Sequence, residues 1–265
     1  MTKKGFTIVV SGKGGSGKTL LASLLVDYFS KKGSVLAIDA DPDSNLPAAL
    51  GVAVKRAVGD VREALLGPED RARPWQTKEQ AFEMGIMEII EETPRFDLVV
   101  MGRSEGEGCY CAINHILRRA IDTKAKNYDY VVVDCEAGLE HLSRRTARRI
   151  DLMLVVTDVT RNGVLTAKRI GELSQELDVK FGETFVVANK VTPETRQLIE
   201  QMCKESGLEV IGYLPFDPGV SQFDLLGKPM LDLPANAPIR DAASKIFERI
   251  AGEEGKIGSK GDFDC

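Results

Sequence analysis

Short runs of β-branched and aliphatic residues alternate along the chain with longer segments in which apolar residues recur every three or four positions. The short runs are typical of buried strands, and the longer segments are typical of helices that cover a sheet. The strand-like runs are FTIVVS, SVLAIDAD, YDYVVVDCEAG, DLMLVVTD, ETFVVANKV and EVIGYLP. Because these runs suit burial on both faces, the alternation predicts an α/β fold, a single doubly wound, mostly parallel sheet with helices on both faces.

The domain organisation follows from where this pattern is continuous. No linker rich in proline, glycine or serine interrupts the middle of the chain, so we expect one domain over residues 1–252. Between residues 61 and 94 the pattern is weaker and predicts a helix and loops. Residues 253–265 are polar and rich in glycine, which predicts a flexible C-terminal tail.

Composition narrows the classes of function. The chain has 265 residues and a formal net charge of −5, which gives no overall attraction to nucleic acid or to anionic membranes. Its apolar runs are much shorter than the ~20 residues of a membrane helix, and the N-terminus leads straight into a strand instead of a signal peptide. We therefore expect a cytoplasmic protein. Five cysteines, an odd number, favour metal binding or buried thiols over a framework of disulfides.

The octapeptide GKGGSGKT follows the first strand and precedes a helix, and it matches the phosphate-loop pattern G-x-x-x-x-G-K-[ST]. In such a loop backbone N–H groups surround phosphate oxygens, Lys18 neutralises the terminal phosphates, and Thr19 holds Mg²⁺. Farther along, Asp134 ends a hydrophobic strand, where a carboxylate reaches the metal through water. The sequence thus predicts a site for nucleotide phosphates and Mg²⁺ with the loop residues Gly12, Lys13, Gly14, Gly15, Ser16, Gly17, Lys18 and Thr19.

Further carboxylates lie in the stretch IDADPDSNL, residues 38–46. Asp39 and Asp41 end a strand beside the phosphate loop, which suits the binding of Mg²⁺ and the ordering of a water molecule for hydrolysis. Capping of a helix by Asp41, Asp43 or Ser44 is the alternative interpretation. The residues alone leave both interpretations open.

The lysine that follows the first glycine makes the loop more specific. KGGSGKT resembles the deviant Walker-A loop of the MinD/ParA/ArsA/nitrogenase-iron-protein class. The resemblance implies a homodimer in which Lys13 reaches across a twofold axis to the partner's nucleotide. It also implies that Asp41 positions the attacking water, that Asp39 lies nearer the metal, and that Asn189, in VVANKV, contacts adenine. The expected catalytic residues are therefore Lys13, Lys18 and Asp41.

Two cysteines stand one residue apart in EGEGCYC, just before a segment that reads as a helix. A helix N-terminus lowers the pKa of a thiol, and two thiolates supply half of the four ligands that a soft divalent ion prefers. A twofold dimer would supply all four, because an isologous interface duplicates every residue near its axis. Cys109 and Cys111 are therefore expected to bind Ni²⁺ or Zn²⁺ between two chains. Two packed free thiols and a redox pair are the alternatives.

GCYC, together with VVVDCEAGLEHLSRRTARRIDLMLVV, resembles the CooC-type nickel-insertion ATPases of carbon monoxide dehydrogenase and acetyl-CoA synthase. The resemblance spans nearly the whole chain. It implies an ATP-dependent metallochaperone whose client is one of these nickel enzymes, with no nucleic acid or membrane as partner. Two alternatives remain. An iron–sulfur electron-transfer ATPase would carry widely spaced cluster cysteines, and a MinD/ParA-like positioning ATPase would need a basic surface or a terminal amphipathic helix.

Overall fold

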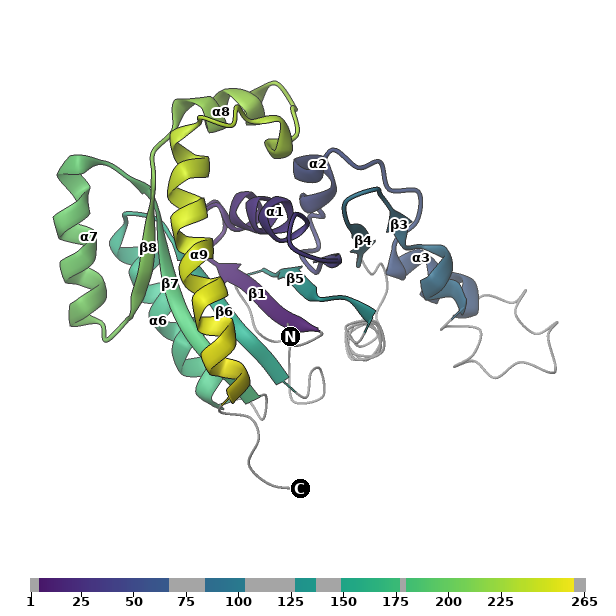
Figure 1. Cartoon of the computed structure of the whole chain (residues 1–265), viewed down its shortest axis with the longest axis horizontal. Coiled ribbons are helices and arrows are strands. Elements are labelled where there is room, and N and C mark those ends of the chain that lie inside the picture. Colours follow the sequence, from purple (N-terminus) through teal and green to yellow (C-terminus); the bar gives the residue numbers. More distant parts are fainter. Residues whose placement is uncertain (1–4, 67–83, 103–126, 137–148, 177–179, 260–265) are drawn as a thin grey trace.

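The computed structural model of the chain describes residues 5–66, 84–102, 127–136, 149–176 and 180–259. Within these residues, eight strands form one sheet (Figure 1). The strands are β1 (Phe6–Gly12), β2 (Val35–Asp39), β3 (Glu91–Glu92), β4 (Asp97–Val100), β5 (Tyr130–Asp134), β6 (Arg149–Thr157), β7 (Lys180–Val191) and β8 (Val210–Pro215).

The sheet is mostly parallel, as the sequence predicted. Its strand order is β3-β4-β2-β5-β1-β6-β7-β8, and β3 alone runs antiparallel to its neighbour. β1 lies between β5 and β6, whereas the next strand in the chain, β2, lies on the far side of β5. The strands β2 to β5 thus lie on one side of β1, and β6 to β8 lie on the other. In doubly wound sheets, ligands bind at the carboxyl ends of the strands where the strand order reverses in this way.

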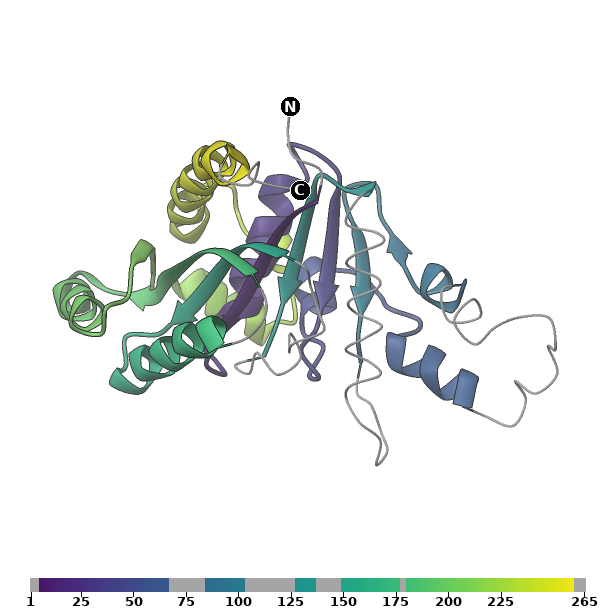
Figure 2. The ribbon, with the colours of Figure 1, turned by 90° about the horizontal axis from the view of Figure 1, so that it is seen from below.

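Helices cover both faces of the sheet, and Figure 2 shows α1 and α9 on one side and α6 and α7 on the other. The described helices are α1 (Lys18–Phe29), α2 (Leu46–Leu50), α3 (Val58–Leu66), α6 (Arg161–Glu176), α7 (Pro193–Glu205), α8 (Pro218–Leu225), the 3₁₀ helix η4 (Met230–Asp232) and α9 (Pro238–Ser259).

The core consists of two apolar layers that the strands separate. In β1, Ile8 and Val10 pack in the cluster that contains the buried side chains of α1 and α9, whereas Val9 packs in the cluster that contains those of α6 and α7. All seven residues of β1 are buried. This burial on both faces is the physical reason for the continuous apolar runs in the sequence.

The C-terminal helix extends beyond the predicted domain boundary. The sequence placed the end of the ordered domain at residue 252, whereas α9 continues to Ser259, so residues 253–259 are helical. Extension of an existing helix adds one hydrogen bond per residue without a new nucleation cost, which offsets the low helix propensity of Gly252 and Gly255. Residues 260–265 lie outside the described residues, and a flexible tail there stays a prediction.

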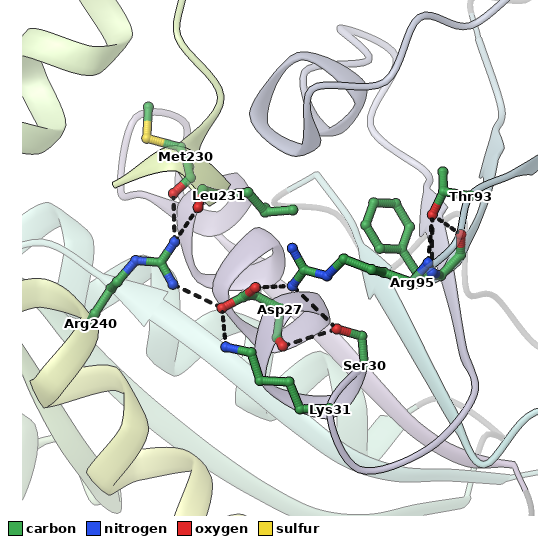
Figure 3. Close-up of polar contacts among 9 residues, drawn as sticks. Asp27, Ser30, Lys31, Thr93, Arg95, Met230, Leu231 and Arg240 are labelled. Atoms are coloured by element: carbon green, nitrogen blue, oxygen red, sulfur yellow. Dashed lines mark hydrogen bonds and ion pairs between the residues drawn. The ribbon is translucent and has the colours of Figure 1, made fainter. Parts of the chain in front are cut away.

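Asp27, in α1, contacts three cationic side chains from different parts of the fold (Figure 3). Its largely buried carboxylate accepts hydrogen bonds from Lys31 Nζ at 2.9 Å, from Arg240 Nη1 at 2.8 Å and from Arg95. Arg240 also donates to two backbone carbonyls of η4. Burial by itself raises the pKa of Asp27, but these hydrogen bonds outweigh it and lower the pKa. The network ties α1 to α9, to η4 and to the loop before β4.

Replacing Asp27 by Asn should lower the free energy of unfolding by about 2 kcal/mol near neutral pH, because Arg240 loses its counter-ion in a largely buried place. Since the pKa of Asp27 is lowered by folding, its stabilising contribution is complete above the ordinary value of 3.8 and is lost as the pH falls through the lower folded value. Urea unfolding of the wild type and of Asp27→Asn at about pH 7 and about pH 3 measures this contribution. The difference between their free energies of unfolding should be smaller at the acidic pH.

The control for this prediction is Asp241→Asn, which breaks an exposed ion pair with Lys245 on α9. Exposed pairs of this kind contribute about 0–1 kcal/mol, so this variant should unfold almost like the wild type. A difference between wild type and Asp27→Asn that stays constant from neutral to acidic pH would contradict the assigned ionic role.

None of the helices in the described part of the chain combines the length and the apolar character that crossing a bilayer requires.

Candidate functional site

The phosphate loop joins β1 to α1 at the carboxyl edge of the sheet (Figure 1). β1 ends at Gly12, where a Cβ atom would lie 2.2 Å from the Val156 carbonyl oxygen. Gly17 precedes α1 with a φ of +98°, a left-handed conformation that glycine adopts without strain. Both positions therefore need glycine. The loop and the N-terminus of α1 together form a concavity suited to anions.

Lys18 and Thr19 are the first two residues of α1. The Lys18 side chain is only 7 % exposed, and its ammonium nitrogen lies 3.9 Å from Asp41 Oδ2. Thr19 Oγ1 donates a hydrogen bond to Asp134 Oδ2 at 2.7 Å. The start of one helix thus places a cation beside one carboxylate and a hydroxyl group beside another.

Asp39 and Asp134 end neighbouring strands and are aligned in the register of β2 and β5. Both are fully buried. Burial, and after it the charge of Asp134, raises the pKa of Asp39 to about 7. Burial likewise raises the pKa of Asp134 to about 6, although the hydrogen bond from Thr19 opposes this. A divalent cation would relieve the repulsion between two such carboxylates.

The contacts of these carboxylates test whether Mg²⁺ fits. Asp134 Oδ1 is buried and has no hydrogen-bond partner among the described residues, which is costly for an acceptor. Both oxygens of Asp39, in contrast, accept backbone hydrogen bonds, from Asp41 at 3.1 Å and from Leu46 at 3.0 Å. The oxygen donors fit Mg²⁺, a hard cation. Thr19 and Asp134 are better placed to hold it than Asp39, which the sequence placed nearer the metal.

Asp39 also stabilises the start of α2. This helix begins at Leu46, whose N–H group donates to Asp39, while the N-cap residue Asn45 makes no side-chain cap bond. The helix is therefore held by a residue that the sequence did not assign to this role. Of the residues in the alternative interpretation, Asp41 accepts the Asp43 N–H group, and Ser44 donates its hydroxyl group to the Asp41 carbonyl oxygen.

Asp41 is directed at the phosphate end of the site. Its Oδ1 atom accepts a hydrogen bond from the Asp43 N–H group at 3.0 Å, and its Oδ2 atom faces Lys18. The side chain is largely buried and borders the cavity described next. A carboxylate in this place can accept a hydrogen bond from a water molecule near the terminal phosphate.

A cavity of about 520 Å³ lies at this edge of the sheet, within the size range of small-molecule sites. It is bordered by the loop residues Gly14, Gly15, Gly17, Lys18 and Thr19 and by two residues from the end of β7 that contact this loop, Asn189 and Lys190. It is also bordered by residues from the end of β8 and from α8, namely Pro215, Phe216, Asp217, Val220, Ser221 and Asp224. This lining suits a ligand with an anionic part at the loop and a second part held by β8 and α8.

The residues from β8 and α8 were not predicted from the sequence. The signal was present in EVIGYLP, a strand that ends at the same edge of the sheet, and in the Asp217 that follows it. Asp217 caps α8 by accepting the Gly219 N–H group and also accepts the Ile239 N–H group at the start of α9. These contacts hold one wall of the cavity in place.

Three predicted loop residues lie around the cavity without bordering it. Gly12 forms the tight turn, and Ser16 is fully buried with its hydroxyl oxygen unpartnered among the described residues. Lys13 is 40 % exposed, and its ammonium nitrogen lies 3.7 Å from the carboxylate of Asp158, just after β6. The Lys13 side chain is therefore directed at the carboxyl end of β6 in the same chain.

Asn189 borders the cavity, but its amide group contacts the loop. The Nδ2 atom donates to the Ser16 carbonyl oxygen at 2.8 Å, and the Oδ1 atom accepts the Lys190 N–H group at 2.8 Å. A contact with adenine stays a prediction for this residue.

The predicted Ni²⁺ or Zn²⁺ ligands, Cys109 and Cys111, lie outside the described residues, as does Cys265. Cys135 and Cys203 are buried free thiols. Burial raises the pKa of both, to about 11 for Cys203 and further for Cys135. Neither thiol ionises readily, so neither is prepared to act as a thiolate ligand.

The sheet topology, the phosphate loop, the buried carboxylates and the cavity define a P-loop nucleotide-binding protein of the α/β class. The chain belongs to the CobQ/CobB/MinD/ParA nucleotide-binding domain family, whose model matches residues 7–230.

Known proteins support this assignment. The chain is 50 % identical to an uncharacterized ATP-binding protein of Methanocaldococcus jannaschii, over 93 % of this chain and 99 % of that protein. It is 30 % identical to the carbon monoxide dehydrogenase accessory protein CooC of Rhodospirillum rubrum, over 94 % of this chain and 98 % of that protein. The fold is similar to that of the septum site-determining protein MinD of Pyrococcus horikoshii complexed with Mg-ADP, with a TM-score of 0.68, 20 % identity and coverage of 95 % and 97 % of the two chains.

Proposed function

We propose that the chain is a magnesium-dependent ATPase. The observation that carries this proposal is that Lys18, Asp41 and Thr19 border a single cavity, with Asp134 bound to Thr19 beside it. Phosphoryl transfer depends mainly on positioning and on charge stabilisation, and these residues supply a cation, a carboxylate for water and oxygen ligands for a metal.

In this mechanism the phosphate loop holds the triphosphate, and Lys18 neutralises charge on its terminal oxygens. Asp41 orients a water molecule, whose oxygen attacks the γ-phosphorus while the bond to the β–γ bridging oxygen breaks. Bound Mg²⁺, held by Thr19 and Asp134, would supply further charge neutralisation at the phosphate oxygens. Phosphate-loop proteins without a stimulating partner are slow, so we expect a basal rate on the order of 10⁻² s⁻¹ or less.

The active form in this proposal is a homodimer, in which Lys13 reaches the partner's nucleotide. The contact of Lys13 with Asp158 is long and partly exposed to solvent. Ion pairs of this kind contribute little to stability, so Lys13 can exchange Asp158 for a phosphate group at small cost.

The finer proposal is that the dimer is a metallochaperone that carries nickel to carbon monoxide dehydrogenase or acetyl-CoA synthase. Its support is the similarity to CooC of Rhodospirillum rubrum and the C-x-C motif at Cys109 and Cys111. Four thiolates from two chains suit a soft divalent cation.

Sedimentation of the reduced protein during titration with Ni²⁺ or Zn²⁺ tests this finer proposal. A metal shared by two chains binds the dimer better than the monomer, so added metal should shift the population to dimers with one metal ion per two chains. The double variant Cys109→Ser, Cys111→Ser should lose this response and keep its affinity for ATP.

Cys203→Ala is the matched control, because the Cys203 thiol is buried and does not ionise readily. It should dimerise with metal like the wild type. A double variant that still dimerises on addition of metal would refute the shared site. A brown chromophore in anaerobically purified protein would favour the iron–sulfur alternative, and no metal response at all would favour a positioning ATPase.

A further inference from the structure

The carboxyl end of β7 departs from regular strand geometry beside the phosphate loop. Ala188 pairs with Tyr213 and Val191 with Pro215, so three steps along β7 match two along β8. The extra residue makes a β-bulge between these pairs. Within the bulge Lys190 has a φ of +59°, a left-handed conformation that is unfavourable for residues other than glycine.

The bulge brings two consecutive side chains to the same loop. In a regular strand, the side chains of Asn189 and Lys190 would point to opposite faces of the sheet. Here Asn189 Nδ2 donates to the Ser16 carbonyl oxygen at 2.8 Å, and Lys190 Nζ donates to the Gly15 carbonyl oxygen at 2.9 Å. The Lys190 N–H group also donates to Asn189 Oδ1, which fixes the orientation of the amide.

These contacts set the directions of two peptide units in the loop. In a trans peptide the C=O and N–H groups point to opposite sides, so a held carbonyl also fixes the following N–H group. The Ser16 N–H group donates to the Lys13 carbonyl oxygen at 3.1 Å, which closes the loop, and Gly17 borders the cavity. The packing is close, because a Cβ atom on Gly17 would lie 2.1 Å from Asn189 Nδ2.

We propose that Lys190 is a positioning residue for the triphosphate: its ammonium group holds the Gly15 carbonyl, so that the phosphate loop keeps its binding conformation. This inference rests on the proposed function, because it gives Lys190 a task in the binding of ATP. Lys190 acts on the loop and not on the reacting atoms. Its task accounts for a lysine at a place where glycine would relieve the backbone, since glycine has no side chain with which to reach the Gly15 carbonyl oxygen.

Two substitutions distinguish the effect of the Lys190 amine from the effect of its backbone conformation. Lys190→Met keeps the apolar length of the side chain and removes the donor, whereas Lys190→Gly removes the donor and also relieves the left-handed conformation. Both variants should bind a non-hydrolysable ATP analogue and ADP, each with Mg²⁺, roughly two- to tenfold more weakly than the wild type. The factor should be the same for both ligands, because the Gly15 contact shapes the loop for either one.

The unfolding temperature and a conservative variant test whether the lower nucleotide affinity comes from the lost donor and not from a damaged fold. Lys190→Gly should unfold at the wild-type temperature or above it, because it removes backbone strain. Lys190→Arg keeps a donor and should recover most of the affinity. Lys245→Met, the same substitution at an exposed lysine of α9, is the control and should leave the affinity unchanged.

Hydrogen exchange of the ligand-free protein tests the contact without any nucleotide. The amides of residues 12–19 should exchange several-fold faster in Lys190→Met and at the wild-type rate in Lys245→Met. Wild-type affinity and exchange in both Lys190→Met and Lys190→Gly would overturn the proposal. A loss confined to the ATP analogue would also overturn it, because it would indicate a direct contact with the γ-phosphate. If the wild type binds no nucleotide, the proposed function fails, and the exchange rates alone decide whether Lys190 holds the loop.

Discussion

Lys18→Ala should weaken the binding of Mg·ATP by about 100-fold or more. The Lys18 ammonium is the buried cation at the phosphate end of the cavity, where it faces Asp41. Without it the triphosphate would approach Asp41, and the buried carboxylates of Asp39 and Asp134, with one positive charge fewer to compensate them. Isothermal titration calorimetry with a non-hydrolysable ATP analogue measures the change.

Lys32→Ala is the control for this variant. Lys32 lies just beyond the opposite end of α1, where its ammonium group stacks on the Tyr28 ring at 4.5 Å, and its loss should leave the affinity unchanged. Circular dichroism of Lys18→Ala should show the wild-type fold. An affinity within about threefold of the wild type would show that the phosphates are not bound at the start of α1.

Asp41→Asn should lower the rate of ATP hydrolysis by about 100-fold or more while the protein still binds ATP. The substitution keeps the size of the side chain and an oxygen that can accept the Asp43 N–H group, but it removes the negative charge that orients the attacking water. Removal of a negative charge beside the phosphates should leave the ATP affinity equal or higher. Single-turnover hydrolysis and equilibrium binding, measured on the same preparation, separate the two effects.

Asp241→Asn, on the surface of α9, serves as the control and should hydrolyse ATP at the wild-type rate. Wild-type turnover in Asp41→Asn would remove Asp41 from the chemical step. A parallel loss of binding and hydrolysis would instead indicate that Asp41 shapes the site through its contacts with Lys18 and Asp43.

Contiguous features were the ones that the sequence could predict. The phosphate loop is eight consecutive residues between a strand and a helix. In the structure, a side chain at Gly12 would clash with the backbone, and a residue other than glycine at Gly17 would be strained. Asp39 and Asp134 were predicted as separate strand ends. Their alignment on neighbouring strands was not predictable, because an apolar run indicates burial and does not indicate which strand lies beside it.

Contacts between distant segments could not be predicted for the same reason. Asp27 meets Arg240 across 213 positions of the chain, and Asn189 meets Ser16 across 173. Neither pair leaves a local pattern, because an ion pair or an amide contact requires no periodicity in the residues around it. The wall of the cavity that β8 and α8 form was missed likewise, since its residues are ordinary for a strand end and a short helix.

By itself, the sequence determined the class of the protein: an α/β sheet from its alternating apolar segments, and a nucleotide site from one local motif with a required geometry. The tertiary structure alone decided how that site is completed. It placed β2 beside β5, so that the two buried carboxylates of Asp39 and Asp134 lie side by side. It also introduced a bulge at the end of β7, from which Lys190 reaches the phosphate loop. Backbone preferences act between neighbours in the chain and can therefore be inferred from consecutive residues. Strand order and side-chain partners depend instead on packing across the whole sheet.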